Sequence, residues 1–422
     1  MKTIETKPIH DTTIRVPGSK SYTHRMLVAA ALADGVSRIE NALVSEDTTC
    51  TRQALEAMGI HMEAADGCLQ VHGRGGIFAP CRKPLYLGNS GTSMRLLTAI
   101  AALGTGTYTL TGTERMTERP IHDLIRAMRQ IGIRVRDLNG NGCPPVEVTG
   151  DVMAGGHVYM DCRISSQYLS ALLLIAPYTK SGIEITVTGG PVSRPYIDMT
   201  VETLKRFGVN VFREGYRHFK VRGGQVLQGG DYEVEPDYSQ AGYFWGAAAI
   251  NGTAVKVQGT KRHSCQGDSQ FPKVLEVMGC RVIYNPDGVT VKGGPLKGID
   301  VDMGDMPDLV PTLAVIAAFA DGTTVIRNVA HLRAKESDRL TAVATELARM
   351  GIETRMSETD LTVIGGTPHG ATIETYDDHR MAMSFAPAGL RVPGIRILDP
   401  SCVEKSFPDF WAVFDQLYDI DR

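Results

Sequence analysis

The segment RAKESDR, residues 333 to 339, places five charged side chains in seven positions, and two of them are carboxylates, which serve as general acids or bases. Opposite charges stand three residues apart, as in Glu336 and Arg339, and this spacing is typical of an exposed helix. In a buried site the same residues would bind an anion and move a proton. The segment alone favours the exposed helix, because runs of charge usually face solvent.

The length and composition indicate an ordinary globular protein of more than one domain. A chain of 422 residues exceeds the size at which one hydrophobic core keeps growing, so we expect two or three domains. The hydrophobic content of 43% and charged content of 22% exclude a disordered or fibrous chain. The net charge of -3 provides no general attraction for nucleic acid or an anionic membrane, so an anion site needs a local cluster of Lys and Arg.

Cysteine and histidine positions indicate no metal site. The eight cysteines form no C-x-x-C pair, so we expect reduced thiols without a metal. The N-terminus lacks an apolar signal segment and the longest apolar runs are too short to cross a bilayer, which predicts a soluble cytoplasmic protein. Five histidines without obvious sequence partners are expected to be surface or packing residues: His10, His61, His72, His157 and His218.

The chain contains six copies of one unit. An apolar helix-like run, a glycine turn and a strand recur about every 70 residues, and a second helix and a hairpin follow. The turn glycines are Gly35, Gly106, Gly182, Gly252, Gly322 and Gly394. The second helices end at Gly59, Gly132, Gly208, Gly279 and Gly351, which are C-cap positions.

The sixth copy lacks its hairpin, whereas the chain begins with a segment of that type, IETKPIHDTTIRVPG. We therefore expect the N-terminus to complete the last repeat. This closure predicts one discontinuous domain, residues 1–16 plus 235–422, and one inserted domain, residues 17–234, with three units in each and a hinge at the two crossings.

The first helix of each unit is apolar on nearly every face, so it is expected to lie inside its domain. Three such helices pointing the same way would bring free N–H groups and partial positive charge to one face. Polar residues stand in register at these predicted helix starts, and many are expected to be simple N-caps. The cations do not fit that role, because Lys and Arg oppose the helix dipole there: Lys20, Arg119, Lys335, Arg339, Arg380 and Lys405.

The placement of these Lys and Arg residues at several helix starts predicts a polyanionic ligand held between two facing domains. Three carboxylates share these positions, Asp308, Glu336 and Asp378, and are the candidate acids and bases. The segment LGNSGTSMR, residues 87–95, would allow close approach of the backbone to an anion, although it is not a P-loop.

Nine segments then identify a resemblance: PGSKSYTHR, LGNSGTSMR, TERPI, ISSQYLSALL, SRPYID, MPDLVPTLA, RAKESDRL, YDDHRMAM and KSFPDFW. In this order, between residues 17 and 411, they resemble the signature segments of the 5-enolpyruvylshikimate-3-phosphate (EPSP) synthase family. The resemblance implies transfer of the enolpyruvyl group of phosphoenolpyruvate to the 5-hydroxyl of shikimate 3-phosphate, with release of phosphate, on the pathway to chorismate. It also implies a two-domain inside-out α/β barrel in which each domain holds three βαβαββ units.

The resemblance assigns roles residue by residue. Shikimate 3-phosphate contacts are implied for Lys20, Ser21, Arg25, Ser165, Ser166, Gln167, Ser193, Tyr196, Asp308, His331 and Lys335. Phosphoenolpyruvate contacts are implied for Lys20, Gly91, Arg119, Gln167, Arg339, Arg380 and Lys405. The catalytic residues implied are Asp308 as the base near the 5-hydroxyl, Glu336 as the acid that protonates the methylene carbon, and Lys20. The inserted domain would carry mainly shikimate 3-phosphate contacts, and the discontinuous domain mainly phosphoenolpyruvate and acid/base residues.

Two departures stand out. His331 takes the place of an Asn that contacts the substrate phosphate in some members, and Leu96 follows the glycine-rich segment where enteric-type members have Pro. Gly91 keeps the small residue that admits glyphosate in the family. The resemblance implies neither metal nor organic cofactor, and we expect a monomer whose partners are the two small substrates, with no nucleic acid or membrane.

Three alternatives remain. The sister enzyme UDP-N-acetylglucosamine enolpyruvyl transferase shares the fold, but it usually carries a reactive Cys on a loop that reads TGTERMTERP here. A phosphoryl-transfer enzyme is disfavoured by the missing P-loop. A non-catalytic anion-binding repeat protein would have no use for Asp308 and Glu336 among the cations.

Overall fold

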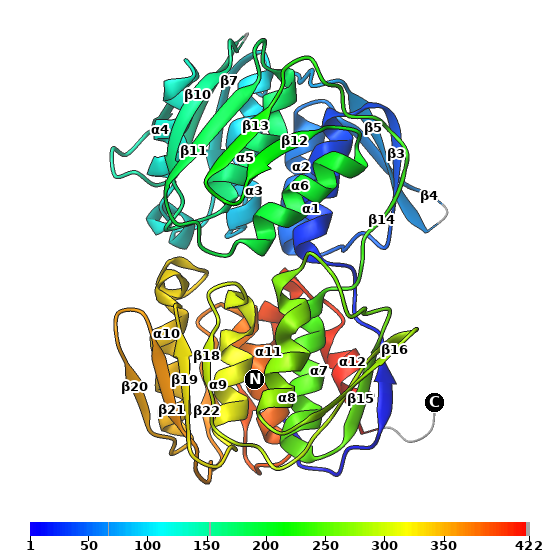
Figure 1. Cartoon of the computed structure of the whole chain (residues 1–422), viewed down its shortest axis with the longest axis vertical. Coiled ribbons are helices and arrows are strands. Elements are labelled where there is room, and N and C mark those ends of the chain that lie inside the picture. The colour runs from blue at the N-terminus through cyan, green and yellow to red at the C-terminus, as the bar shows by residue number, and fades with distance from the viewer. Residues whose placement is uncertain (66, 152, 419–422) are drawn as a thin grey trace. The chain divides into compact units, whose positions relative to one another are not determined.

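The computed structural model describes residues 1–65, 67–151 and 153–418, and its contacts divide the chain into two compact units (Figure 1). The inserted unit is Gly18–Val234. The discontinuous unit combines Met1–Pro17 with Glu235–Arg422. Each unit is a mixed α/β structure of three helix-bearing repeats, as the sequence predicted.

The inserted unit contains three four-stranded sheets. In the spatial order of each sheet, the first and second strands are parallel, and the remaining neighbours are antiparallel. In spatial order the strands are β14(Asp231–Glu233), β3(Asp34–Glu40), β5(Cys68–Arg74) and β4(His61–Ala65); β6(Leu85–Tyr86), β7(Gly106–Thr111), β9(Val146–Gly150) and β8(Arg134–Asp137); and β10(Gly156–Asp161), β11(Ile183–Gly189), β13(His218–Val221) and β12(Val211–Glu214).

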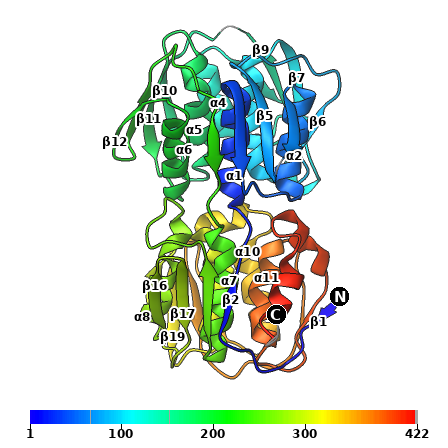
Figure 2. The same ribbon diagram turned by 90° about the vertical axis from the view of Figure 1, so that its right-hand side faces the viewer.

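The inserted unit places its most apolar helices inside, with the sheets around them (Figure 2). The inner helices are α1(Lys20–Leu32), α3(Gly91–Ile100) and α5(Gln167–Ile175), and α3 contacts both of the others. The remaining helices are α2(Glu46–Ala57), α4(His122–Gln130) and α6(Pro195–Arg206), with 3-10 turns η1(Ala101–Leu103), η2(Arg115–Glu118) and η3(Ala176–Tyr178). Nearly every residue of the inner helices is buried, as their lack of a polar face predicted.

The discontinuous unit repeats this plan. Its sheets are β2(Thr12–Ile14), β15(Ala254–Gln258), β17(Gly288–Lys292) and β16(Arg281–Asn285); β18(Asp300–Asp302), β19(Thr323–Arg327), β21(Leu361–Ile364) and β20(Thr354–Met356); and β22(Thr372–Ile373), β23(Arg396–Ile397) and β1(Lys2–Thr3). Its helices are α7(Tyr238–Asn251), α8(Phe271–Val277), α9(Val310–Ala317), α10(Arg339–Arg349), α11(His379–Gly389) and α12(Phe410–Asp415), with 3-10 turns η4(Gly267–Gln270), η5(Pro307–Leu309), η6(Ala330–Ala334) and η7(Pro400–Lys405). The inner helices α7, α9 and α11 contact one another pairwise.

The N-terminal segment serves two repeats rather than the last one alone. β1 pairs antiparallel with β23 and so extends the sixth sheet, as expected. β2, however, runs parallel to β15 as the first strand of the fourth repeat. The expectation of a single hairpin completing the sixth repeat was therefore wrong in part, because the two strands form ladders with different sheets.

The turn glycines share a backbone conformation that explains their recurrence. Each of the six has a positive φ, between 74° at Gly252 and 90° at Gly106 and Gly322. At Gly35 an added Cβ would meet no atom within 4 Å, so the positive φ alone favours glycine there.

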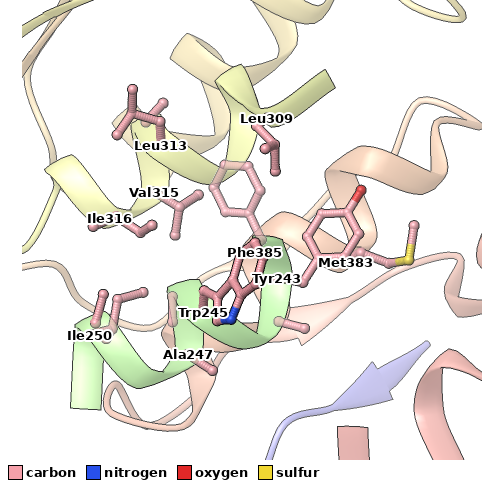
Figure 3. Close-up of a cluster of buried hydrophobic side chains, with 14 of the residues drawn as sticks. Tyr243, Trp245, Ala247, Ile250, Leu309, Leu313, Val315, Ile316, Met383 and Phe385 are labelled. Atoms are coloured by element: carbon pink, nitrogen blue, oxygen red, sulfur yellow. The ribbon is translucent and has the colours of Figure 1, made fainter. Parts of the chain in front are cut away.

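The core of the discontinuous unit is a continuous apolar cluster between its inner helices (Figure 3). Trp245 of α7, Leu313 of α9 and Phe385 of α11 are fully buried in it, and the indole N–H of Trp245 donates to the carbonyl of Val289 at 3.2 Å. This packing fixes the three helices and therefore the positions of their N-termini. Among the described residues, no helix combines the length and apolarity needed to cross a lipid bilayer.

We expect Leu313→Ala to lower the free energy of unfolding of the discontinuous unit by about 2–5 kcal/mol, because it leaves a cavity between rigid helices. Denaturant unfolding followed by circular dichroism measures this loss. The control is Val277→Ala at a side chain that is 70% exposed, which should change stability by less than about 0.5 kcal/mol. Equal effects of the two substitutions would contradict the assigned core.

Candidate active site

The first helix of the inserted unit begins with a buried ion pair. Ser19 caps α1, its hydroxyl accepting from the N–H of Tyr22, and Lys20 is the first helical residue. The ammonium group of Lys20 donates to Oδ2 of Asp47, in the first turn of α2, at 2.9 Å. Both side chains are buried, so the carboxylate offsets the unfavourable placement of a cation at a helix start.

The start of α3 is a backbone site flanked by two guanidinium groups. A Cβ built on Gly91 would lie 2.5 Å from Nη2 of Arg119 and 2.6 Å from Nη1 of Arg95. Arg119 is held there by Asn89, whose backbone and side-chain oxygens accept from Nη1 at 2.8 and 2.9 Å. Buried guanidinium groups beside a helix N-terminus form an arrangement suited to an anionic ligand.

Gln167 connects this group to the start of α5. Its side-chain oxygen accepts from Arg95 at 2.9 Å, and its amide nitrogen donates to the hydroxyl of Thr92 at 2.9 Å. The backbone N–H of Gln167 donates to the hydroxyl of Ser165 at 3.2 Å, and Ser166 occupies the N-cap position. Gln167 therefore lies beside Arg95 of α3, and the two serines immediately precede it.

Arg25 joins α1 to α6. Its guanidinium is fully buried and donates to the carbonyl oxygens of Ser21 and Tyr196 and to the hydroxyl of Thr200. Burial lowers the pKa of Arg25 to about 10, which still leaves it charged at neutral pH. Ser193, just before α6, has a φ of 52°, a left-handed conformation that costs energy in a non-glycine residue and is frequent at functional sites.

In the discontinuous unit, Arg339 lies among three carboxylates. It is the first residue of α10, its side chain is 1% exposed, and it donates to Asp378 at 2.7 Å, Glu336 at 2.7 Å and Asp308 at 2.9 Å. Burial lowers the pKa of Arg339, but the three negative neighbours outweigh burial and raise it. The guanidinium therefore stays charged and holds together residues from the entrances of three helices, α9, α10 and α11.

Asp308 is shared by two arginines. Oδ1 accepts from Arg339, and Oδ2 accepts from Nη2 of Arg380 at 2.7 Å. Arg380 also donates to the hydroxyl of Tyr243 at 2.9 Å, and Asp378 caps α11 by accepting from the N–H of Arg380. The starts of α9, α10 and α11 thus meet in one network of buried charges.

The segment RAKESDR, residues 333–339, is partly exposed and partly buried, so neither the exposed helix nor the buried site describes all of it. Residues 330–334 form η6, the helix α10 begins only at Arg339, and Glu336 lies in the turn between them. Arg333 pairs with Asp338 at 3.1 Å in a partly exposed position, whereas Glu336 and Arg339 face the buried network. The exposed-helix interpretation is therefore wrong for Glu336 and Arg339, which are buried, whereas Arg333 is partly exposed as expected but lies in a 3-10 turn.

His331, Lys335 and Lys405 complete the predicted set in this unit. Burial and the nearby charge of Lys335 lower the pKa of His331 to about 3, so its imidazole is neutral at neutral pH and can donate one hydrogen bond. Lys335 follows η6 directly, and Lys405 ends η7 in a buried position.

Four residues that contact or neighbour the predicted site residues lay outside the predicted set: Asp47, Arg95, Tyr243 and Asp268. Asp268 is buried, accepts a short hydrogen bond from the Ser239 hydroxyl in the first turn of α7, and has Asp308 as a charged neighbour. A signal existed for two of them, because Asp47 is the last residue of the polar segment SED and Asp268 comes shortly after KRHSCQ, both at predicted helix starts. Sequence position alone offers no means of pairing them with Lys20 or Asp308.

The chain is similar to one enzyme family over nearly its whole length. The family model described as EPSP synthase (3-phosphoshikimate 1-carboxyvinyltransferase) matches residues 5–414. A 3-phosphoshikimate 1-carboxyvinyltransferase of Methanoculleus marisnigri is 44% identical over 409 residues, 96% of both chains. One of Yersinia pseudotuberculosis is 43% identical over 410 residues, again 96% of both chains.

Solved structures agree with this similarity. An EPSP synthase of Acinetobacter baumannii superposes with a TM-score of 0.80 at 31% identity and covers 98% of this chain and 97% of its own. An enolpyruvyl transferase of Streptomyces tendae reaches a TM-score of 0.79 at 22% identity, covering 98% and 96%, which supports the fold alone.

Asp268 gives the site a testable pH dependence. Burial and the neighbouring Asp308 raise the pKa of Asp268 from 3.8 to about 7. Between these values the folded protein binds a proton that the unfolded chain does not, so this carboxyl makes stability fall as pH rises through the window.

We therefore expect the free energy of unfolding to fall more steeply between about pH 5 and about pH 7 in the wild type than in Asp268→Asn, by at most about 1.4 kcal/mol per pH unit. Denaturant titrations at several pH values measure both slopes. A stability difference between the two proteins that does not change with pH would contradict the assignment.

Proposed function

The chain belongs to the EPSP synthase (3-phosphoshikimate 1-carboxyvinyltransferase) family, and we propose that it transfers the enolpyruvyl group of phosphoenolpyruvate to the 5-hydroxyl of shikimate 3-phosphate, releasing phosphate. The observation that carries the residue-level proposal is the buried network around Arg339, in which Asp308 and Glu336 stand among cations. A protein that only binds anions gains nothing from carboxylates at such positions, because they repel the ligand.

The inserted unit supplies mainly contacts to shikimate 3-phosphate in this proposal. Hydroxyl and amide groups suit a polyhydroxylated ring, and the buried Arg25 and Lys20 suit its phosphate and carboxylate. These contacts are assigned to Lys20, Ser21, Arg25, Ser165, Ser166, Gln167, Ser193 and Tyr196, with Asp308, His331 and Lys335 from the discontinuous unit. The guanidinium carbon of Arg25 lies 5.9 Å from the centre of the Tyr196 ring, a cation–π contact that supports a fixed orientation of both side chains.

Phosphoenolpyruvate is assigned to the cations that lie beside helix starts. Its phosphate and carboxylate match the guanidinium groups of Arg119, Arg339 and Arg380 and the ammonium groups of Lys20 and Lys405. Gly91 and Gln167 lie among or beside these cations, and the missing Cβ of Gly91 leaves the backbone open to an anion. The assignment of shikimate 3-phosphate mainly to the inserted unit, and of phosphoenolpyruvate mainly to the discontinuous unit, stays a prediction.

The reaction is an addition followed by an elimination. The 5-hydroxyl adds to C2 of phosphoenolpyruvate while a proton reaches C3, which forms a tetrahedral intermediate. Phosphate then leaves as a proton is removed from the methyl carbon. Asp308 is assigned as the base for the hydroxyl and Glu336 as the acid for carbon, while fixed cations stabilise the charge of the intermediate and of the departing phosphate.

The ion pairs suggest how binding prepares these carboxylates. Each oxygen of Asp308 accepts from a guanidinium group, and Glu336 accepts from Arg339. A substrate hydroxyl must compete with those donors. When the phosphoenolpyruvate anion takes up Arg339 and Arg380, it replaces the carboxylates as their partner and leaves Asp308 and Glu336 available for proton transfer.

The nearest alternative substrate is the UDP-sugar of the sister enzyme, and a phosphate-release assay separates the two. With phosphoenolpyruvate, we expect turnover with shikimate 3-phosphate and none with UDP-N-acetylglucosamine. The reverse result would overturn the proposed substrate. The cytoplasmic location, the monomeric state and the independence from cofactors remain predictions from the sequence.

We expect Asp308→Asn and Glu336→Gln each to reduce kcat by about 10²–10⁴-fold, because each removes one proton-transfer group. Steady-state phosphate release measures kcat, and circular dichroism verifies folding. Asp300→Asn and Glu353→Gln are matched controls, because both carboxylates form exposed ion pairs with arginines and should leave kcat unchanged. Full activity in both site variants would refute their roles.

We expect Gly91→Ala to raise the KM for phosphoenolpyruvate at least tenfold while the affinity for shikimate 3-phosphate stays within about twofold. The added methyl group would meet the guanidinium groups of Arg119 and Arg95, which must then move. Initial-rate kinetics with each substrate varied in turn measures the split. The same assay tests competitive inhibition of the wild type by glyphosate against phosphoenolpyruvate, which the family resemblance at Gly91 predicts. An equal rise in both constants would argue for general damage.

A further inference from the structure

Two histidines and a glutamate lie close together on the edge strand β4 and the neighbouring strand β5 of the first sheet of the inserted unit. His61 and Glu63 lie two residues apart on β4 and therefore point to the same face of the strand. His72 of β5 is the direct cross-strand partner of His61. The hairpin of β4 and β5, which is labelled in Figure 1, thus brings together three residues of types that can bind transition metals.

The distances between their ligand atoms suit one metal ion. Nε2 of His61 lies 3.8 Å from Oε2 of Glu63, and Nε2 of His72 lies 3.6 Å from Oε1. One ligand atom from each of the three residues can be chosen so that all lie within 4.8 Å of one another. Ligands about 2.0–2.1 Å from a tetrahedral zinc ion are about 3.3 Å apart, so small side-chain rotations bring these atoms into place.

Direct contacts between the side chains do not account for this cluster. Both nitrogen-to-oxygen distances exceed the length of a hydrogen bond. Nε2 of His72 is shielded from solvent and has no hydrogen-bond partner among the described residues. The two imidazole rings lie 4.9 Å apart at an angle of 47°, so they are not stacked face to face. The β3 residue opposite His72 is Val36, which offers no competing charge.

We propose that His61, Glu63 and His72 form a binding site for a divalent transition metal, with Zn²⁺ as the reference ion. Two imidazole nitrogens and one carboxylate are a recognised ligand set for zinc, whereas Mg²⁺ and Ca²⁺ prefer oxygen ligands throughout. Water supplies the fourth ligand. His61 and His72 are surface residues, as expected, but the expectation that they lack neighbours is wrong, because strand pairing places the two side by side.

The bound ion links the two strands of the hairpin and leaves the proposed reaction untouched. The ligand residues are separate from those assigned to substrates, so the site stabilises β4 and β5 by binding only the folded arrangement. Imidazole nitrogen binds a metal only when unprotonated, so affinity falls as the pH decreases.

Isothermal titration of the reduced full chain with ZnCl₂ tests the site directly. We expect one equivalent of zinc to bind and to raise the thermal midpoint. His61→Gln and His72→Gln should each weaken that binding at least tenfold, with no change in the midpoint of the metal-free protein. Replacing zinc by Co²⁺ should produce the visible absorption of tetrahedral cobalt in the wild type alone.

The matched control is His218→Gln. His218 pairs with Glu184 across adjacent strands at 3.0 Å, but Lys220 occupies the place of a second imidazole and also pairs with that carboxylate. This substitution should leave zinc affinity within twofold of the wild type. Zinc binding that is unchanged in His61→Gln and His72→Gln would place the metal on the cysteines and overturn the proposal. The absence of binding at 100 μM zinc would overturn it as well.

Discussion

The burial of Arg339 is the constraint on which the candidate site depends. A guanidinium group taken out of water costs several kcal/mol unless its hydrogen bonds and charge are matched, and Asp308, Glu336 and Asp378 provide that match. The match fixes where three carboxylates point. Because they come from the entrances to α9 and α10 of the fifth repeat and α11 of the sixth, one buried cation links three helix starts from two repeats.

Repetition explains how so many charges can gather in each unit. A helix buried on nearly all faces accommodates few polar groups along its length, so most of its polar residues gather towards its N-terminus. Three repeats bring three such termini together, and each contributes free N–H groups and the positive end of a helix dipole. Cations at these positions are unfavourable for the isolated helix. Carboxylate partners offset that cost, as Asp47 does for Lys20.

The guanidinium groups at the helix starts have different hydrogen-bond partners in the two units. In the inserted unit, oxygen atoms of neutral groups hold the guanidinium groups, as Asn89 holds Arg119 and Gln167 holds Arg95. In the discontinuous unit, carboxylates hold them. Under the proposed function, an anion would add to neutral contacts at Arg119, but it would displace a carboxylate at Lys20, Arg339 and Arg380. In that proposal, Asp308 and Glu336 become available for proton transfer when the anion takes their place beside Arg339 and Arg380.

Local patterns in the sequence determined the six repeats, the buried helices, the positive-φ turns and the register of the polar residues at helix starts. Each of these follows from the period of apolar residues or from the conformational freedom of glycine, which act over a few neighbouring positions. The signature segments determined the family. Only the tertiary structure decided which carboxylate pairs with which cation, since Asp308, Arg339 and Asp378 approach one another through packing between repeats. The same holds for Asp268, whose raised pKa arises from burial and a distant neighbour, and for His61 and His72, which strand register brings together. These contacts join residues far apart in the chain or on opposite strands, and no local periodicity encodes them.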